Sequence, residues 1–261
     1  MLRPRIIPCL LISSGGLVKT RVFKAPQYVG DPINAVKIFN EKQVDELIVL
    51  DIDASITGAE PDYGLIAKLA KECRMPLCYG GGINNVDQAF QIMESGVEKV
   101  AIGAAAVTNT QLLSEISLGA GRQSVVAVLD VRKRKKNFSD GYEICTHNAT
   151  RLHKGNPIEV AANLQQAGVG EIVINSVDRD GERCGYDLEL ARQICDKVQV
   201  PATFLGGAGS LDHIIDLFNV CGTVGAAAGS LFVFKGKYRA VLLSYPSIVK
   251  RDDIFQIVQR S

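Results

Sequence analysis

The sequence predicts an α/β protein that folds as a single (β/α)8 barrel, the TIM-barrel architecture. Two observations carry this prediction. Short apolar runs alternate along the 261 residues with segments of helical periodicity, and the chain repeats itself at a fixed offset. Eight strand–helix units are the number that closes such a barrel, and the length fits one barrel. We therefore predict a single domain over residues 1–261.

The predicted strands are short apolar runs. In chain order they cover residues 6–12, 46–52, 76–78, 99–102, 125–131, 171–176, 201–205 and 222–227. Helical periodicity follows most of them, over residues 32–43, 86–95, 157–167, 188–198 and 211–220. Asp31-Pro32 and Asn156-Pro157 each place a capping side chain before a proline at the first helical position.

The internal repeat relates two halves of the chain. The segment that begins at Pro32 aligns without gaps with the segment that begins at Pro157, an offset of 125 residues (157 − 32). The same offset pairs further residues: Glu46 with Glu171, Asp53 with Asp178, Gly81 with Gly206, and Gly82 with Gly207. We predict two half-barrels, about residues 1–124 and 125–261, with equivalent groups on opposite sides of the barrel axis.

The composition excludes several classes of protein. Because the net charge is +1, we expect no binding to nucleic acid. No apolar stretch is long enough to insert in a membrane, and the N-terminus carries no apparent secretory signal. The seven cysteines and three histidines lack metal-ligand spacing. We interpret the cysteines as reduced core residues of a cytoplasmic protein, and expect neither a metal nor a cofactor.

Glycine-rich turns that follow predicted strands are candidate phosphate sites. Their backbone N–H groups, together with the N-termini of the next helices, attract anions. We predict a ligand with a phosphate at each end, while the alternative is that these glycines only satisfy tight turns. The candidates are Gly81 and Gly82 in the first half and Asp180, Gly181, Gly206, Gly207, Gly229 and Ser230 in the second, with Lys19 from the loop after the first strand.

Several motifs span nearly the whole chain: RIIPCL, VDELIVLDID, YGGGI, GVEKVAI, SVDRDG followed by GYDLEL, and GGAGSLDH. Together they resemble the cyclase subunit of imidazole glycerol phosphate synthase. The resemblance implies a (β/α)8 fold made of two duplicated half-barrels. It also implies an enzyme of the lyase class and a separate glutaminase, whose ammonia passes through the barrel to a bis-phosphorylated ribonucleotide. The products would be imidazole glycerol phosphate and aminoimidazole carboxamide ribonucleotide, a step of histidine biosynthesis.

The resemblance further implies two strand-end aspartates that act as general acid and base, and here the pair is incomplete. Asp130 matches one of them, whereas Leu11 stands where the other is expected. Leucine has no proton to exchange, so the paired-carboxylate mechanism fails. Nearby positions also depart from the family: Gly103-Ala104 replaces Asn-Thr, Asn175 replaces threonine, and Leu205 replaces serine.

Four charged residues open predicted strands at the opposite, N-terminal face of the barrel: Arg5, Glu46, Lys99 and Glu171. Inward charges at a barrel base are costly unless they pair, so we predict a salt-bridge ring. The resemblance implies that this ring is the gate through which ammonia enters from a docked glutaminase. A simple ion-pair plug is the alternative.

The altered first strand, PCLLI, and the closing segment GSLFVFKGKYRAVLLSYPS are similar to a subset of the family encoded with surface-polysaccharide genes. That similarity implies ammonia delivery to amidate a sugar precursor in O-antigen-type synthesis, with a third, amidotransferase protein as a further partner. Two alternatives stay open. One is an authentic histidine-pathway cyclase that relies on Asp130, and the other is a non-catalytic scaffold that activates the glutaminase.

Two smaller features lie near the predicted site. The basic run VRKRKK (131–136) is expected in the loop after the fifth strand, as a solvated loop or as a lid over an anionic substrate. Asp51 and Asp53 end the second strand, where we expect them to orient Lys19 or the loop backbone, or to serve a structural role only.

Overall fold

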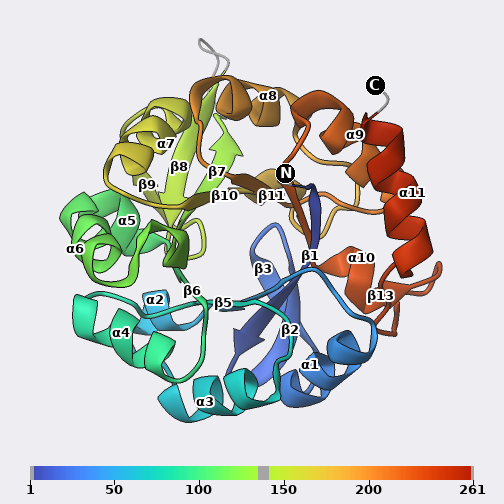
Figure 1. The fold of residues 1–261 in the computed structure, drawn as a ribbon, viewed down its shortest axis with the longest axis horizontal. Coiled ribbons are helices and arrows are strands. Elements are labelled where there is room, and N and C mark those ends of the chain that lie inside the picture. Colours follow the sequence, from blue (N-terminus) through green and yellow to red (C-terminus); the bar gives the residue numbers. More distant parts are fainter. Residues whose placement is uncertain (1–2, 135–140, 260–261) are drawn as a thin grey trace.

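The computed structural model describes residues 3–134 and 141–259, and within these ranges eight parallel strands close into a barrel (Figure 1). The strands are β1 (Arg5–Ser13), β4 (Leu47–Asp51), β5 (Leu77–Gly80), β6 (Lys99–Ile102), β7 (Val125–Lys133), β10 (Glu171–Ser176), β11 (Ala202–Leu205) and β12 (Gly225–Ala228). Each pairs in parallel with the next one, and β12 closes the ring on β1. The predicted (β/α)8 fold is confirmed.

Helices surround the barrel. They are α1 (Pro32–Glu41), α2 (Ala54–Thr57), α3 (Tyr63–Glu72), α4 (Val86–Glu94), α5 (Ala104–Thr108), α6 (Thr110–Ala120), α7 (Pro157–Gln166), α8 (Leu188–Lys197), α9 (Leu211–Cys221), α10 (Ser230–Val233) and α11 (Ile248–Gln259). The predicted caps are present, because the side chain of Asp31 accepts the N–H of Asn34 and that of Asn156 accepts the N–H of Ile158. None of the helices in the described ranges has the length and apolar character that crossing a membrane requires.

Several elements begin 125 residues apart. Helices α1 and α7, at residues 32 and 157, each have 10 residues. Strands β5 and β11 begin at residues 77 and 202, and helices α4 and α9 begin at residues 86 and 211. The 125-residue offset found in the sequence therefore also relates helices to helices and strands to strands in the structure.

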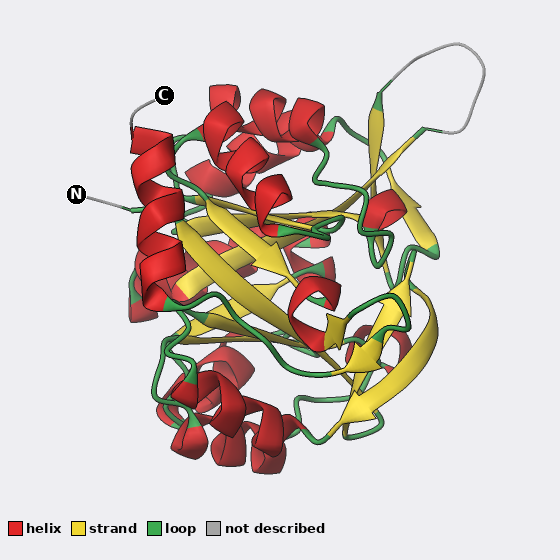
Figure 2. Cartoon of the chain, turned by 90° about the vertical axis from the view of Figure 1, so that its right-hand side faces the viewer, coloured by secondary structure: helices red, strands yellow, loops and turns green. Residues whose placement is uncertain are grey.

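Two antiparallel hairpins extend the barrel at the ends of β1 and β7. Strands β2 (Gly16–Arg21) and β3 (Lys24–Gly30) continue from β1, and β8 (Tyr142–Thr146) and β9 (Arg151–His153) continue from β7. A short pair, β13 (Phe234–Lys235) and β14 (Ala240–Val241), follows α10. The termini lie at the opposite end of the barrel from the extensions of β1 and β7 (Figure 2).

These extensions correct two predictions. The chain after the first strand is a hairpin rather than a loop, since residues 16–30 pair with β1 and with one another. The basic run 131–136 begins inside a strand, because β7 continues to Lys133 and pairs with β8. Its last two residues lie outside the described ranges.

The barrel interior is built in layers by the two-residue period of the strands. In β1, Arg5, Ile7, Cys9 and Leu11 share the inward face, while Ile6 and Leu10 pack outward in the core between strands and helices. A ring of charges forms the base layer. Above it lies an apolar interior cluster: Ile7, Cys9, Ile48, Cys78, Ala101, Val126, Val128, Val173, Leu205 and Ala227, with Leu11 and Leu50 packed on it.

Candidate functional site

A cavity of about 570 Å³ occupies the C-terminal mouth of the barrel. The ends of all eight parallel strands line it, as do both hairpins. Most of the residues predicted for catalysis and phosphate binding meet here: Leu11, Lys19, Gly81, Gly82, Asp130, Asp180, Gly181, Gly206, Gly207, Gly229 and Ser230. The four charged residues predicted for the gate lie apart from them, at the barrel base.

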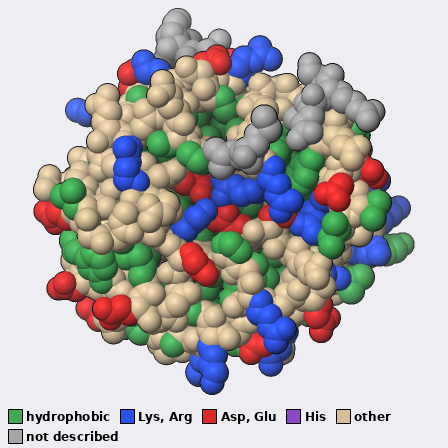
Figure 3. Space-filling view, viewed as in Figure 1, with side chains coloured by type: hydrophobic (Ala, Val, Ile, Leu, Met, Phe, Trp, Pro, Cys, Tyr) green, Lys and Arg blue, Asp and Glu red, His purple; other side chains and the backbone are tan. Residues whose placement is uncertain are grey.

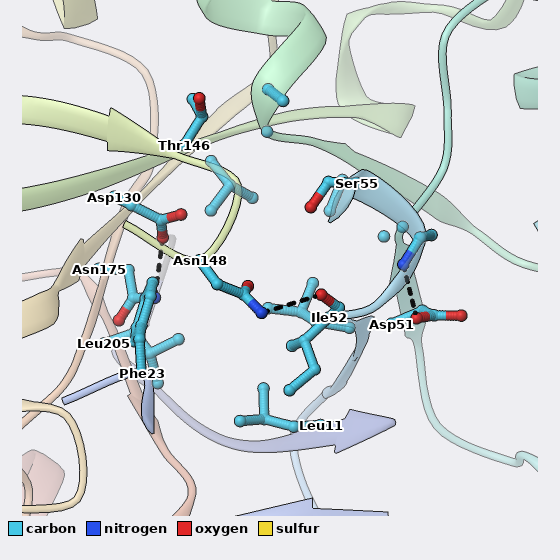
Figure 4. Close-up of a pocket in the computed structure, with 18 of the residues that line it drawn as sticks. Leu11, Phe23, Asp51, Ile52, Ser55, Asp130, Thr146, Asn148, Asn175 and Leu205 are labelled. Atoms are coloured by element: carbon cyan, nitrogen blue, oxygen red, sulfur yellow. Dashed lines mark hydrogen bonds between the residues drawn. The ribbon is translucent and has the colours of Figure 1, made fainter. Parts of the chain in front are cut away.

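Asp130 and Leu11 lie on opposite sides of this cavity (Figure 4). Asp130 is held by its neighbour on the adjacent strand, since Asn175 Nδ2 donates to Asp130 Oδ1 at 3.0 Å. Leu11 faces the cavity from β1, and Leu205 faces it from β11. The Asp130 carboxylate and the Asn175 carboxamide therefore form one polar part of the cavity wall, and Leu11 and Leu205 form an apolar part.

The environment of Asp130 brings its pKa close to neutral pH. The pKa of Asp130 is raised to about 7, mainly because the group is buried. The hydrogen bond from Asn175 lowers the pKa, and the negative charge of Asp180 raises it. A carboxyl group with a pKa near the working pH exchanges protons efficiently in either direction. Asp130 is thus suited to general acid–base chemistry without a second carboxylate beside it.

The predicted phosphate glycines line the cavity at two places. Gly81 and Gly82 precede α4, and Gly206 and Gly207 precede α9. Gly207 has a φ of +101°, and a Cβ there would lie 2.0 Å from the carbonyl oxygen of Gly185. Tight packing alone therefore accounts for glycine at position 207. Phosphate binding by these turns stays a prediction.

Lys19 and Asp180 hold the β2–β3 hairpin over the mouth. Lys19 Nζ donates to the carbonyl of Cys9 at 2.9 Å, and burial lowers the pKa of Lys19. Asp180 Oδ2 accepts from Thr20 Oγ1 at 2.7 Å and from the N–H of Phe23 at 3.2 Å. Asp180 therefore anchors the hairpin, and its predicted part in ligand binding stays a prediction.

Asp51 and Asp53 bind loop backbone and not Lys19. Asp51 Oδ1 accepts the N–H of Asp53 at 2.9 Å and that of Ala54 at 3.2 Å. Asp53 accepts from the hydroxyl of Ser13 at 2.9 Å and from the N–H of Ser14 at 2.8 Å. The two carboxylates fix the turn after β4 and the end of β1 around the cavity.

The four charged residues at the base form a closed ring. Arg5 donates to Glu46 and, at 2.8 Å, to Glu171. Lys99 Nζ donates to Glu46 at 2.7 Å and to Glu171 at 2.8 Å. Each cation thus contacts both anions, as a buried set of charges requires. Thr203 Oγ1 adds a bond to Glu171 at 2.6 Å.

This ring lies on the face shown in Figure 3, where Lys and Arg side chains gather beside Asp and Glu near the barrel axis. Arg5 and Lys99 keep 23% and 19% of their side-chain surface exposed, whereas Glu46 and Glu171 are buried. Burial acts to raise the pKa of Glu171, but Arg5 and Lys99 together lower it to about 2. The Glu171 carboxylate therefore stays charged at neutral pH.

Sequence reasoning missed the contribution of the β8–β9 hairpin to the cavity. Thr146, His147, Asn148 and Arg151 line its wall, and Asn148 Nδ2 donates across the mouth to the carbonyl of Ile52 at 3.1 Å (Figure 4). The alternation of Tyr142 and Ile144 with polar residues, followed by His-Asn-Ala, is a hairpin signal that could have revealed it.

The three histidines do not lie as far apart as the sequence suggests. His147 and His153 both bond to the hydroxyl of Thr146, whereas His213 lies on α9 and accepts the N–H of Gly209 at 3.1 Å. Among residues 3–134 and 141–259, no three His, Cys, Asp or Glu side chains come together in a way that could hold a metal ion.

Comparison with known proteins assigns the family. A sequence model described as "Histidine biosynthesis protein" matches residues 5–239. The chain is 53% identical over 252 residues to a Pseudomonas aeruginosa protein provisionally named imidazole glycerol phosphate synthase subunit hisF2, covering 97% of this chain and 99% of the relative. It is 49% identical over 255 residues to a provisionally named HisF of Leptospira borgpetersenii, covering 98% and 100%.

More distant relatives carry the HisF name without a number. The imidazole glycerol phosphate synthase subunit HisF of Saccharolobus solfataricus is 37% identical over 232 residues, which cover 89% of this chain and 91% of the relative. The matches extend over nearly the whole barrel, and they agree with the layered interior and the cavity described above. The chain belongs to the family of imidazole glycerol phosphate synthase cyclase subunits, HisF.

Proposed function

We propose that this chain receives ammonia from a glutaminase subunit at its N-terminal face and delivers it through the barrel to an acceptor in the mouth cavity. The acceptor is a sugar precursor of a surface glycan, which the ammonia amidates. The observation that carries the proposal is the contrast between the two barrel ends. The charged ring at the base is complete, whereas the strand-end carboxylate pair of the mouth has lost one member at Leu11.

The interior supports passage of a neutral molecule. Apolar side chains of the interior cluster, among them Ile7, Ile48, Val126 and Val173, lie above the ring toward the cavity. An ammonium ion would pay a large desolvation penalty there, whereas uncharged ammonia would not. The ring can exclude water and ions at the entrance while its side chains, two of them part-exposed, move apart for ammonia.

The mouth supports a changed acceptor. Leu11 and Leu205 give an apolar wall, and Asp130 with Asn175 gives a polar one. A substrate that fits this cavity places an apolar group against Leu11 and Leu205, and places its electron-poor carbon beside Asp130 and Asn175. The lone pair of ammonia forms the new C–N bond while the π electrons of that carbon move to its oxygen. Asp130 supplies a proton to that oxygen, which leaves as water when the nitrogen has lost its extra protons and its lone pair forms the C=N bond of the amidino group.

The pattern of identities also favours a function outside histidine synthesis. The chain is 53% identical to relatives provisionally named hisF2 and hisF3 and 49% identical to one provisionally named HisF, but only 37% identical to a relative whose HisF name carries no such qualification. A duplicated copy is free to change its acceptor when another copy keeps the original reaction.

Deletion of the gene in the source organism tests the proposal. We expect growth without histidine to continue, and mass spectrometry of the surface polysaccharide to show loss of an amidino-bearing sugar. Histidine auxotrophy with an unchanged polysaccharide would overturn the proposal. Restoring the gene on a plasmid provides the control, since it must restore the sugar.

The second candidate is the authentic cyclase reaction of histidine biosynthesis. Its specific support is Asp130, whose carboxyl group lies in the cavity with a pKa near 7 and can serve as both acid and base in turn. Purified protein with ammonium salt and the bis-phosphorylated ribonucleotide tests it. Turnover within about 100-fold of a two-aspartate cyclase would favour this candidate, because loss of one acid–base group removes about 10²–10⁴ in rate.

A further inference from the structure

The turn between β8 and β9 holds His147 in the cavity wall. His147, Asn148 and Ala149 have φ angles of +54°, +52° and +61°. Non-glycine residues in this left-handed region are uncommon, and such strain collects at functional sites. Two bonds secure the turn, since Thr150 Oγ1 donates to the His147 carbonyl at 2.6 Å and Asn148 donates to the carbonyl of Ile52.

One hydroxyl joins His147 to a second histidine. Thr146 Oγ1 lies 2.9 Å from Nδ1 of His147 and 2.7 Å from Nε2 of His153. A hydroxyl has one proton and two lone pairs, so it can donate to one ring and accept an N–H from the other. In that arrangement the two neutral rings carry their protons on the same nitrogen, either both on Nδ1 or both on Nε2.

This chain of groups leads from the cavity to the outer strand of the hairpin. Cys145 pairs directly with Asp130 in the β7–β8 ladder, so Thr146 follows one residue beyond the Asp130 position. Figure 4 shows Thr146 on the Asp130 side of the cavity, across from Leu11. His153 lies on β9, half-buried and outside the cavity lining.

We propose that His147 accepts a proton from the ammonia nitrogen, and that Thr146 and His153 carry it away from the cavity. The inference rests on the proposed function, in which ammonia attacks an acceptor in this cavity. His147 is a catalytic residue in this scheme, and Thr146 and His153 are positioning residues.

The proton transfer balances along the chain. When the ammonia nitrogen has bonded to carbon, it carries a positive charge and releases a proton to Nε2 of His147, keeping the N–H electron pair. The Nδ1 proton of His147 then moves to Thr146 Oγ1, the hydroxyl proton moves to Nε2 of His153, and Nδ1 of His153 releases its proton to water. Each group ends neutral, and no other reactant is required.

The protonation state of His147 agrees with this role. Burial lowers its pKa, and the positive charge of Arg151 lowers it further, so the His147 ring is neutral at pH 7. Within the described ranges, Nε2 of His147 has no hydrogen-bond partner, which leaves its lone pair open.

The tautomers can be read directly by nitrogen NMR, because the chain has only three histidines. In the apo protein at pH 7.5 we expect His147 and His153 both to carry the proton on Nδ1. Thr146→Val should release them to the usual Nε2–H form, while Thr146→Ser should keep the wild-type tautomers. Nε2–H rings in the wild-type protein, or no change in Thr146→Val, would overturn the relay.

The amidino sugar content of the polysaccharide provides the second measurement, in strains carrying chromosomal variants. We expect His147→Gln to reduce the sugar at least about 100-fold, as loss of an acid–base group does, and His153→Gln and Thr146→Val to reduce it less. Leu152→Ala is the matched control, since its exposed side chain lies between the two histidines in sequence. Equal sugar content in His147→Gln and in the control would overturn the proposal.

The two measurements separate this inference from the function beneath it. The NMR result depends only on the apo protein. If the tautomers behave as expected but the wild-type strain makes no amidino sugar, the proposed acceptor is wrong while the relay stands. If the sugar is present but Thr146→Val leaves the histidine tautomers unchanged, the relay is wrong while the proposed function stands.

Discussion

Asn175 donates its amide N–H to Asp130 Oδ1 across adjacent strands β10 and β7, at 3.0 Å. Within the described residues, this is the side-chain hydrogen bond that the Asp130 carboxyl accepts, in a cavity that Asp51 and Asp180 also line. Because the bond favours the charged form of Asp130, it opposes the effect of burial. The pKa of Asp130 therefore depends on Asn175, whose side chain does not itself exchange protons.

The first prediction concerns that bond. Asn175→Leu removes the donor and fills the space with an apolar group of similar size, so the pKa of Asp130 should rise above about 7. Titration of the Asp130 carboxyl carbon by NMR measures the shift. Asn148→Ala removes another amide from the cavity wall that does not contact Asp130, and should leave the pKa unchanged. A lower pKa in Asn175→Leu would contradict the prediction.

The second prediction links Asp130 to stability. Its pKa is near 4 in an unfolded chain and about 7 in the folded protein, so the folded state binds the proton more tightly. The destabilising effect of Asp130 is thus absent below about pH 4, grows between pH 4 and 7, and is complete above pH 7. Asp130→Asn should lack this pH dependence.

Urea unfolding at pH 4.5 and pH 8 measures the effect. The stability of Asp130→Asn relative to wild type should increase between these two pH values by about 2–4 kcal/mol, because one pKa unit corresponds to about 1.4 kcal/mol and cavity water offsets part of the shift. Asp252→Asn, an exposed position on α11, should show no such increase. A parallel pH dependence of wild type and Asp130→Asn would refute a raised pKa.

The barrel could be predicted because its signal is local and repeated. Each of the eight strands is a short apolar run, and proline with a capping side chain marks the start of α1 and α7. The β2–β3 hairpin was missed because β3 is exposed along most of its length and β2, although largely buried, contains the polar residues Lys19 and Thr20. Their stability comes from pairing with β1 and from Asp180, which lies far away in the sequence.

The charged ring at the barrel base could be predicted from the sequence, whereas part of the cavity at the mouth could not. The ring could be inferred because four charged residues open strands that must converge, and charges in a barrel base have only one another as partners. The link between His147 and His153 could not, since it depends on the register of β8 with β9, where Ile144 pairs with His153. Sequence spacing alone does not give that register.

The third prediction restores the missing carboxylate. Leu11→Asp places an acid on β1 across the cavity from Asp130, where the resemblance to the cyclase subunit implies one. With ammonium salt and the bis-phosphorylated ribonucleotide, turnover should increase several hundred-fold over wild type, within the about 10²–10⁴ that one acid–base group supplies.

Leu11→Asn is the matched control for this gain. It has nearly the same shape as Leu11→Asp and is polar, but it cannot exchange a proton at neutral pH. Equal turnover in the two variants would show that polarity alone changed the cavity, and no gain in either would show that other departures, such as Leu205, also block the cyclase reaction.

The fourth prediction concerns the stability of the ring. Glu46→Ala leaves Arg5 and Lys99 sharing Glu171 alone. Removing one member of a buried ion pair costs about 3–5 kcal/mol, whereas replacing both members by apolar groups costs much less. The free energy of urea unfolding at pH 7 should therefore fall by that amount in Glu46→Ala and by less in the double variant Glu46→Met/Lys99→Met. A larger loss in the double variant would contradict a mutually paired ring.

The fifth prediction separates a gate from a plug. In a complex with the glutaminase, ammonia made from glutamine must enter past the ring, whereas ammonia from added salt can also reach the cavity through its open mouth. Glu46→Ala changes only the entrance, since Glu46 lies at the base and does not line the cavity. Amidated product labelled from amide-15N glutamine should therefore fall in the variant, while product labelled from 15N-ammonium should stay at the wild-type level. The double variant, which keeps the fold but lacks half of the ring charges, should show the same selective loss. If both sources of nitrogen lose activity equally, the four charges hold the barrel base together and do not admit ammonia.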